Sequence, residues 1–199
     1  MSKLTWKPST LLAPVPPAMV TCGTMEESNI ITVAWTGIVN TIPPMTYVSI
    51  RPERHSYSII KNSGEFVINL TNRQLIRAAD FCGARTGAKI DKFRELQLTK
   101  EAVSALSCPA IAESPLNLEC RVTQILPLGS HDMFLAEIIA VNVAEELIDT
   151  TGKLCLEKAG LAAFSHGEYF ELGKKIGTFG YSVRKKKSPP KRRRQENTK

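Results

Sequence analysis

The stretch Asn29-Ile-Ile-Thr-Val-Ala-Trp-Thr36 is followed by Pro43-Pro44 and then by Tyr47-Val-Ser-Ile-Arg-Pro-Glu-Arg-His-Ser56. β-Branched residues dominate the first stretch and begin the last one, which is typical of strands. The two prolines predict a break between the strands, and the polar run after Ile50 predicts a turn into a helix. Small residues, an aromatic ring, and arginines with a hydroxyl at a helix start are what a phosphorylated planar ligand needs.

The same patterns continue outward from this block. Further strands are predicted at residues 18–24, 65–70, 118–126 and 133–143, with a short candidate at 147–149. Helices are predicted at residues 56–62, ending at Gly64, and at 72–81, with a long connection over 96–116. These elements lack a strand–helix–strand rhythm. The sequence therefore predicts a mainly β fold, a closed antiparallel barrel with helices packed outside.

Composition and charge exclude several functional classes. The chain has 199 residues, 43% of them hydrophobic, and this is enough for one buried core. Its net charge is +7, but residues 184–199 alone carry +8, so the rest carries −1. A near-neutral body gives no basic face for nucleic acid, and we expect no nucleic-acid partner. No run of about 18 apolar residues is present, so no membrane span is expected.

The chain divides into three parts. Residues 1–17 are Pro-rich and predicted to form an extended arm, residues 18–183 form the domain, and residues 184–199 form a basic tail. The low complexity of the tail predicts disorder, and we assign it no part in the chemistry. Five widely spaced cysteines and the absence of a secretory signal predict reduced thiols and a cytoplasmic location.

Three residues at the predicted helix start form the first candidate site. Arg51, Arg54 and Ser56 could hold a phosphate through guanidinium forks, a hydroxyl and free backbone N–H groups. A surface turn with solvated arginines and an ordinary helix cap explains the same spacing. Trp35, followed by Thr36 and Gly37, could be the apolar wall of a ring site, or a tryptophan of the barrel core.

Two further candidates lie elsewhere in the chain. Lys92 follows a Gly-containing loop and could attract an anion, although a solvated charge run is the commoner explanation. His131 lies in the polar turn Gly129-Ser-His-Asp132 and could hydrogen-bond a ligand, or have no role at all. No zinc spacing, phosphate loop, dinucleotide fingerprint or nucleophile elbow is present in the sequence.

Together these patterns resemble the flavin reductase-like, FMN-binding split-barrel proteins, and in particular the flavoredoxin-type branch. The resemblance runs from about residue 10 to about residue 184, and the order and spacing of its motifs are more specific than any one of them. The matching segments are Asn29-Ile-Ile-Thr-Val-Ala-Trp35, Pro43-Pro44, Ser49-Ile-Arg-Pro-Glu-Arg-His-Ser56, Gly64-Glu-Phe-Val-Ile-Asn-Leu70, Asp80-Phe-Cys-Gly83, Asp91-Lys-Phe93, Gly129-Ser-His-Asp132 and Gly177-Thr-Phe-Gly-Tyr-Ser182.

The resemblance implies a six-stranded antiparallel Greek-key split barrel that works as a homodimer, with FMN in a groove at or near the subunit interface. It implies flavin contacts from Asn29 and from the residues around Trp35, with phosphate contacts from Ser56, Arg51 and Arg54. Lys92 would add positive charge, and His131 would stand near the ring. The implied FMN-binding residues are Asn29, Ala34, Trp35, Thr36, Arg51, Arg54, Ser56, Lys92, His131 and Phe164.

The implied function is that of a flavoprotein oxidoreductase. Electrons would pass from NAD(P)H or a redox protein through bound FMN to an acceptor. Because the flavin carries the reaction at its own ring, no catalytic side chain is expected. A non-enzymatic electron carrier built on the same FMN site is the alternative. Lys92 and His131 are hypothetical donors to the reduced ring, and Cys82 is expected to be a small buried residue.

Overall fold

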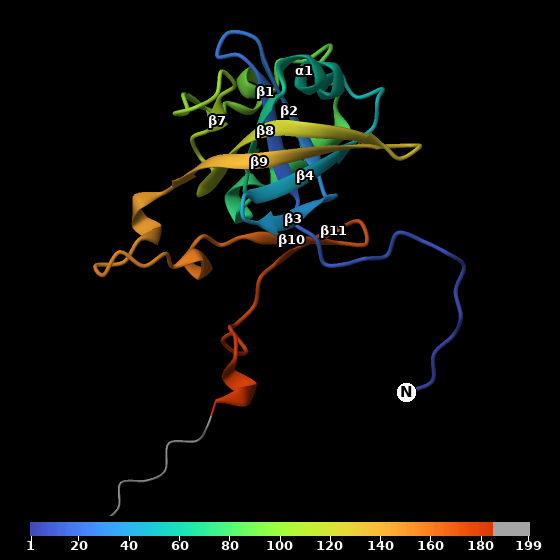
Figure 1. The fold of residues 1–199 in the computed structure, drawn as a ribbon, viewed down its shortest axis with the longest axis vertical. Helices are drawn as coiled ribbons and strands as arrows, with labels where there is room; N and C mark the ends of the chain where they lie inside the picture. Colours follow the sequence, from blue (N-terminus) through green and yellow to red (C-terminus); the bar gives the residue numbers. More distant parts are fainter. Residues whose placement is uncertain (185–199) are drawn as a thin grey trace, which may run out of the picture.

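The computed structural model describes residues 1–184, and its main feature is one antiparallel sheet of seven strands. The strands lie in the order β2-β1-β5-β8-β9-β4-β3 (Figure 1). They are β1 (Ala18–Gly23), β2 (Ser28–Val33), β3 (Thr36–Thr41), β4 (Pro44–Ile50), β5 (Glu65–Asn69), β8 (Leu116–Pro127) and β9 (Asp132–Val143).

The two outermost strands of this order are consecutive in the chain. Only Ala34 and Trp35 separate β2 from β3, and the backbone N–H of Ser49 in β4 donates to the carbonyl of Trp35 over 2.9 Å. The sheet therefore closes on itself, and β2 with β3 acts as one bent strand of a six-stranded barrel. The closed antiparallel barrel predicted from the sequence is confirmed. The bend at Ala34 and Trp35 leaves a gap between the end of β2 and the end of β4.

Strand β2 is buried on both faces, which explains why two isoleucines, Ile30 and Ile31, follow one another in it. Ile31 and Val33 point into the barrel core with Val20, Phe66 and other residues. Ile30 lies on the opposite face of the strand and packs in a second cluster that includes residues of the outer helices. Successive side chains of a strand alternate between its faces, so one face fills the barrel and the other carries helices.

Three helices and a 3-10 turn surround the barrel. They are α1 (His55–Ser63), η1 (Arg73–Leu75), α2 (Ile76–Ala84) and α3 (Lys92–Leu96). Helix α1 ends at Gly64, which has a φ of 70°, as the sequence predicted. Helix α3 begins after Asp91, whose side chain caps the helix by accepting from the N–H of Arg94.

The remaining elements are short. They are β6 (Lys100–Glu101), β7 (Ala110–Ile111), η2 (Glu145–Leu147), η3 (Leu156–Lys158), β10 (Ala162–Ser165), β11 (Glu168–Glu171) and η4 (Tyr181–Val183). The short strand predicted at residues 147–149 is wrong. Leu147 ends η2, and only Ile148 forms a single bridge, to Leu154.

Residues 1–17 form an extended segment that leaves the rest of the molecule beside β10 and β11, and residues 1–14 are exposed (Figure 1). Their one bridge joins Val15 to Phe164 of β10. All five cysteines lie within the described residues and are unpaired and buried. None of the helices described is long and apolar enough to cross a membrane. The predicted basic tail falls, apart from Arg184, outside the described residues.

Candidate functional site

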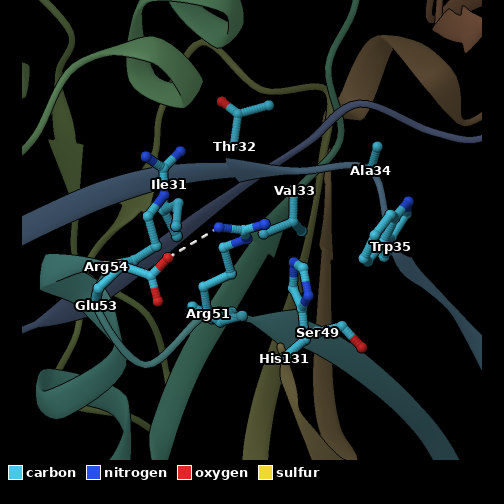
Figure 2. A pocket seen from close by; sticks show the side chains of 11 residues that line it. Ile31, Thr32, Val33, Ala34, Trp35, Ser49, Arg51, Glu53, Arg54 and His131 are labelled. Atoms are coloured by element: carbon cyan, nitrogen blue, oxygen red, sulfur yellow. Dashed lines mark hydrogen bonds and ion pairs between the residues drawn. The ribbon is translucent and has the colours of Figure 1, made fainter. Parts of the chain in front are cut away.

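A cavity of about 430 Å³ occupies the gap between the end of β2 and the end of β4. We call it the first cavity. The bend after β2 and the turn after β4 form its walls, and His131 reaches it from the start of β9 (Figure 2). The lining residues are Ile31, Thr32, Val33, Ala34, Trp35, Ser49, Ile50, Arg51, Glu53, Arg54 and His131.

Trp35 forms one end of the first cavity and is 43% exposed, which excludes the interpretation as a barrel-core tryptophan. Its ring lies against the ring of His131, with 4.5 Å between the centroids and 48° between the planes. Burial and the nearby Arg51 cation lower the pKa of His131 below its usual 6.5, although Glu53 opposes them. His131 is therefore a neutral ring near pH 7 and can donate or accept a hydrogen bond.

A smaller second cavity of about 130 Å³ adjoins the first at the start of α1. The two cavities share Ile31, Glu53 and Arg54, so they adjoin each other, and together we call them the groove. The second cavity brings together residues from β2, α1, α2, the loop after α2, and α3. Its lining residues are Asn29, Ile31, Glu53, Arg54, His55, Ser56, Cys82, Arg85, Thr86, Gly87 and Lys92.

The start of α1 faces this second cavity without a side-chain cap. Arg54 is the residue before the first turn, and it makes no capping hydrogen bond. Its guanidinium instead donates to the carbonyl of Gly83 in α2. Ser56 is 1% exposed and lies inside the first turn, so it is not the ordinary helix cap considered above. Uncapped N–H groups at a helix start attract anions.

Lys92 is the most unusual charge of the site. Its side chain is buried, and its Nζ donates to the carbonyl oxygens of Ile30 at 2.6 Å and Cys82 at 2.8 Å. This burial excludes a solvated charge run. Burial lowers the pKa of Lys92, Arg54 lowers it further, and the thiols of Cys82 and Cys22 oppose them. The three ion pairs found within residues 1–184 do not include Lys92.

Comparisons with known proteins identify the family. The family model described as "Flavin reductase like domain" matches residues 11–172. The chain belongs to this flavin reductase-like family. The resemblance inferred from the sequence is therefore confirmed.

Similar structures confirm the split-barrel fold. The structure is similar to the flavoredoxin of Desulfovibrio vulgaris (Miyazaki F), with a TM-score of 0.85 and 27% identity, over 92% of this chain and 100% of that one. It is similar to the flavoredoxin from Methanosarcina acetivorans, with a TM-score of 0.82 and 25% identity over the same shares. An uncharacterized protein of Archaeoglobus fulgidus is 32% identical over 125 residues, which are 63% of this chain and 71% of that protein.

Most of the predicted flavin-binding residues of this flavin reductase-like protein lie along the groove. The first cavity collects Ala34, Trp35, Arg51, Arg54 and His131, and the second collects Asn29, Arg54, Ser56 and Lys92. Their roles toward a ligand stay predictions. Arg51 is largely exposed and pairs with Glu53 over 3.0 Å, as the dashed line in Figure 2 shows.

Two predicted residues lie apart from the groove. Thr36 begins β3, and its hydroxyl donates to the carbonyl of Tyr47 at 2.6 Å, which ties β3 to β4. Phe164 packs against Tyr169, with 5.2 Å between the ring centroids. It lines another cavity, of about 590 Å³, together with Ala34, Trp35 and seven of the residues between Trp6 and Val15. Phe164 can therefore contact a ligand in the groove only if that ligand extends past Ala34 and Trp35.

Sequence reasoning missed the loop that closes the second cavity. Arg85, Thr86 and Gly87 follow the end of α2 and form the wall opposite α1. The Gly-containing stretch that begins at Cys82 was a usable signal, because glycines permit close backbone approach. A single sequence does not show, however, that this loop packs beside Ser56.

Proposed function

We propose that this protein binds FMN in the groove formed by the two cavities, with the phosphate in the second cavity and the ring system in the first. The observation that carries the proposal is the buried Lys92 ammonium. A buried cation is costly without an opposite charge nearby, and two carbonyl dipoles offset only part of that cost. A phosphate beside it would supply the missing negative charge.

Other groups of the second cavity support the same assignment. The uncapped start of α1 offers backbone N–H groups, and Ser56 offers a hydroxyl. Arg54 and Arg85 supply positive charge. Such convergence of cationic and hydrogen-bond donors is typical of phosphate sites. The cavity holds about 130 Å³, so it suits a phosphate group better than a ring system as large as isoalloxazine.

The first cavity suits a flat, partly polar ring. Ile31, Val33 and Trp35 supply apolar surface, while Arg51 and the neutral ring of His131 supply polar groups at one side. Bound FMN would supply hydride and single-electron chemistry at its own ring, so the chain has only to position it and set its electrostatics. This agrees with the expectation that no side chain acts as a catalytic acid, base or nucleophile.

We infer that the bound flavin passes electrons from NAD(P)H or a redox protein to an acceptor. The structural likeness to flavoredoxins also supports the second candidate, an electron carrier that stays loaded with FMN. Anaerobic stopped-flow mixing of the FMN-loaded protein with NADH and with NADPH separates the two. Bleaching of the flavin absorbance within seconds supports a reductase. No bleaching by either nucleotide, together with reduction by dithionite, favours the carrier.

The homodimer implied by the family stays a prediction. Its support is a set of exposed apolar side chains on β3 and the following turn, namely Ile38, Val39 and Ile42, which are 65%, 48% and 89% exposed. Apolar surface of this kind is typical of interaction sites. Sedimentation velocity at micromolar concentration checks it, since a monomer would contradict it. The cytoplasmic location also stays a prediction, and the five unpaired cysteines support it.

A further inference from the structure

Asn29 and Gly87 form a pair whose function the proposed FMN site does not explain. Asn29 lies in β2, is 5% exposed, and its Nδ2 donates to Ser56 Oγ over 2.7 Å. A Cβ added at Gly87 would stand 2.0 Å from Asn29 Oδ1. Only a residue without a side chain therefore fits at position 87 while Asn29 holds Ser56.

The direction of the Asn29–Ser56 hydrogen bond matters for the second cavity. The hydroxyl of Ser56 accepts from the Asn29 amide, so its own hydrogen is left to donate elsewhere. Within the described residues the group that can accept that hydrogen is the sulfur of Cys22. Cys22 lies close by, but burial raises the pKa of its thiol to about 11, although Ser56 and Lys92 oppose this, and it stays neutral. A neutral thiol is a weak competitor for the hydroxyl hydrogen.

We propose that Asn29 is a positioning residue: seated against Gly87, it turns the Ser56 hydroxyl so that this donates to the phosphate of the bound flavin. This inference rests on the proposed function. It assigns Asn29 to the phosphate through Ser56 and not to the flavin ring. Hydrogen bonds to a charged acceptor are about twice as strong as neutral ones, so the geometry of one hydroxyl has a measurable effect on affinity.

The test compares FMN with riboflavin, which has the same ring but no phosphate. Asn29→Ala and Gly87→Ala should each raise the Kd for FMN about tenfold, which corresponds to about 1.4 kcal/mol, and leave the Kd for riboflavin within a factor of about two. Asn62→Ala and Gly173→Ala are matched controls, because Asn62 is exposed near the end of α1 and lines neither cavity, and Gly173 has open space around it. Both controls should bind like the wild type.

A double-mutant cycle with Ser56→Ala separates positioning from direct contact. If Asn29 acts through Ser56, adding Asn29→Ala to Ser56→Ala should cost no further FMN affinity. Additive losses, an equal loss for riboflavin, or no loss for FMN would each overturn the inference. Failure of the wild type to bind FMN would instead overturn the proposed function. Thermal denaturation of each variant confirms that it is folded before its affinity is compared.

Discussion

At the scale of single residues, Lys92 is the charge around which the site is organised. It is held between the carbonyls of Ile30 and Cys82, which ties β2 to α2. The sequence placed it near an anion site, but its burial could not be predicted, because a lysine beside Asp91 and Arg94 has the pattern of an exposed charged segment. Only the packing of α3 against β2 and α2 reveals it.

Replacement of Lys92 by methionine tests its role, because methionine keeps most of the length of the side chain and removes the charged amino group. We expect Lys92→Met to raise the Kd for FMN about tenfold, to leave the Kd for riboflavin nearly unchanged, and to leave the midpoint potential of the bound flavin unchanged. A shifted potential with unchanged affinity would place Lys92 beside the ring instead. Fluorescence titration and spectroelectrochemistry measure the two quantities.

The pH dependence gives a second readout for Lys92. Burial lowers the pKa of this lysine, so its charge is present below the lowered value and is lost as the pH rises through it. Wild-type FMN affinity should therefore fall as the pH rises through the lowered pKa of Lys92, and Lys92→Met should lack that fall. Lys100→Met is a matched control and should keep the fall in affinity. Lys100 also donates to backbone carbonyls, those of Met25 and Glu26, but it does not line the second cavity.

At the scale of elements, the strand pattern predicted most of the barrel and missed β3. The interval between Thr36 and Pro43 looked like a break because it contains Gly37 and leads to two prolines. In the structure Thr41 pairs with Pro44, so the prolines stand at a tight hairpin between two strands. Local propensity does not show this pairing, because β3 is held by its partner β4 and is largely exposed elsewhere.

Helix α1 gives an element-scale prediction. Gly64 ends it at a φ of 70°, a conformation that costs a residue with a side chain about 1 kcal/mol. We expect Gly64→Ala to lower the melting temperature by about 2–4 °C, as that loss implies for a domain of this size. Gly173→Ala has open space and no such φ, and it should melt like the wild type. Equal melting temperatures of the two variants, measured by circular dichroism, would contradict this account of the helix end.

At the scale of the whole molecule, the barrel positions the groove through its one irregularity. The bent strand formed by β2 and β3 closes the sheet at Trp35, and the same bend opens the first cavity beside the start of α1. The family and the barrel could be predicted from the order of the sequence motifs. The sequence could not predict that the loop with Arg85 lines the second cavity or that Phe164 lies apart from the groove. Both features depend on contacts between distant segments.

The most direct measurement is isothermal titration calorimetry of the flavin-free protein, with FMN and, in parallel, with riboflavin as the titrant. The proposed site predicts one FMN per chain and a Kd for riboflavin at least about tenfold higher, because the second cavity would be left without its anion. Absence of FMN binding, or equal affinity for the two flavins, would contradict it.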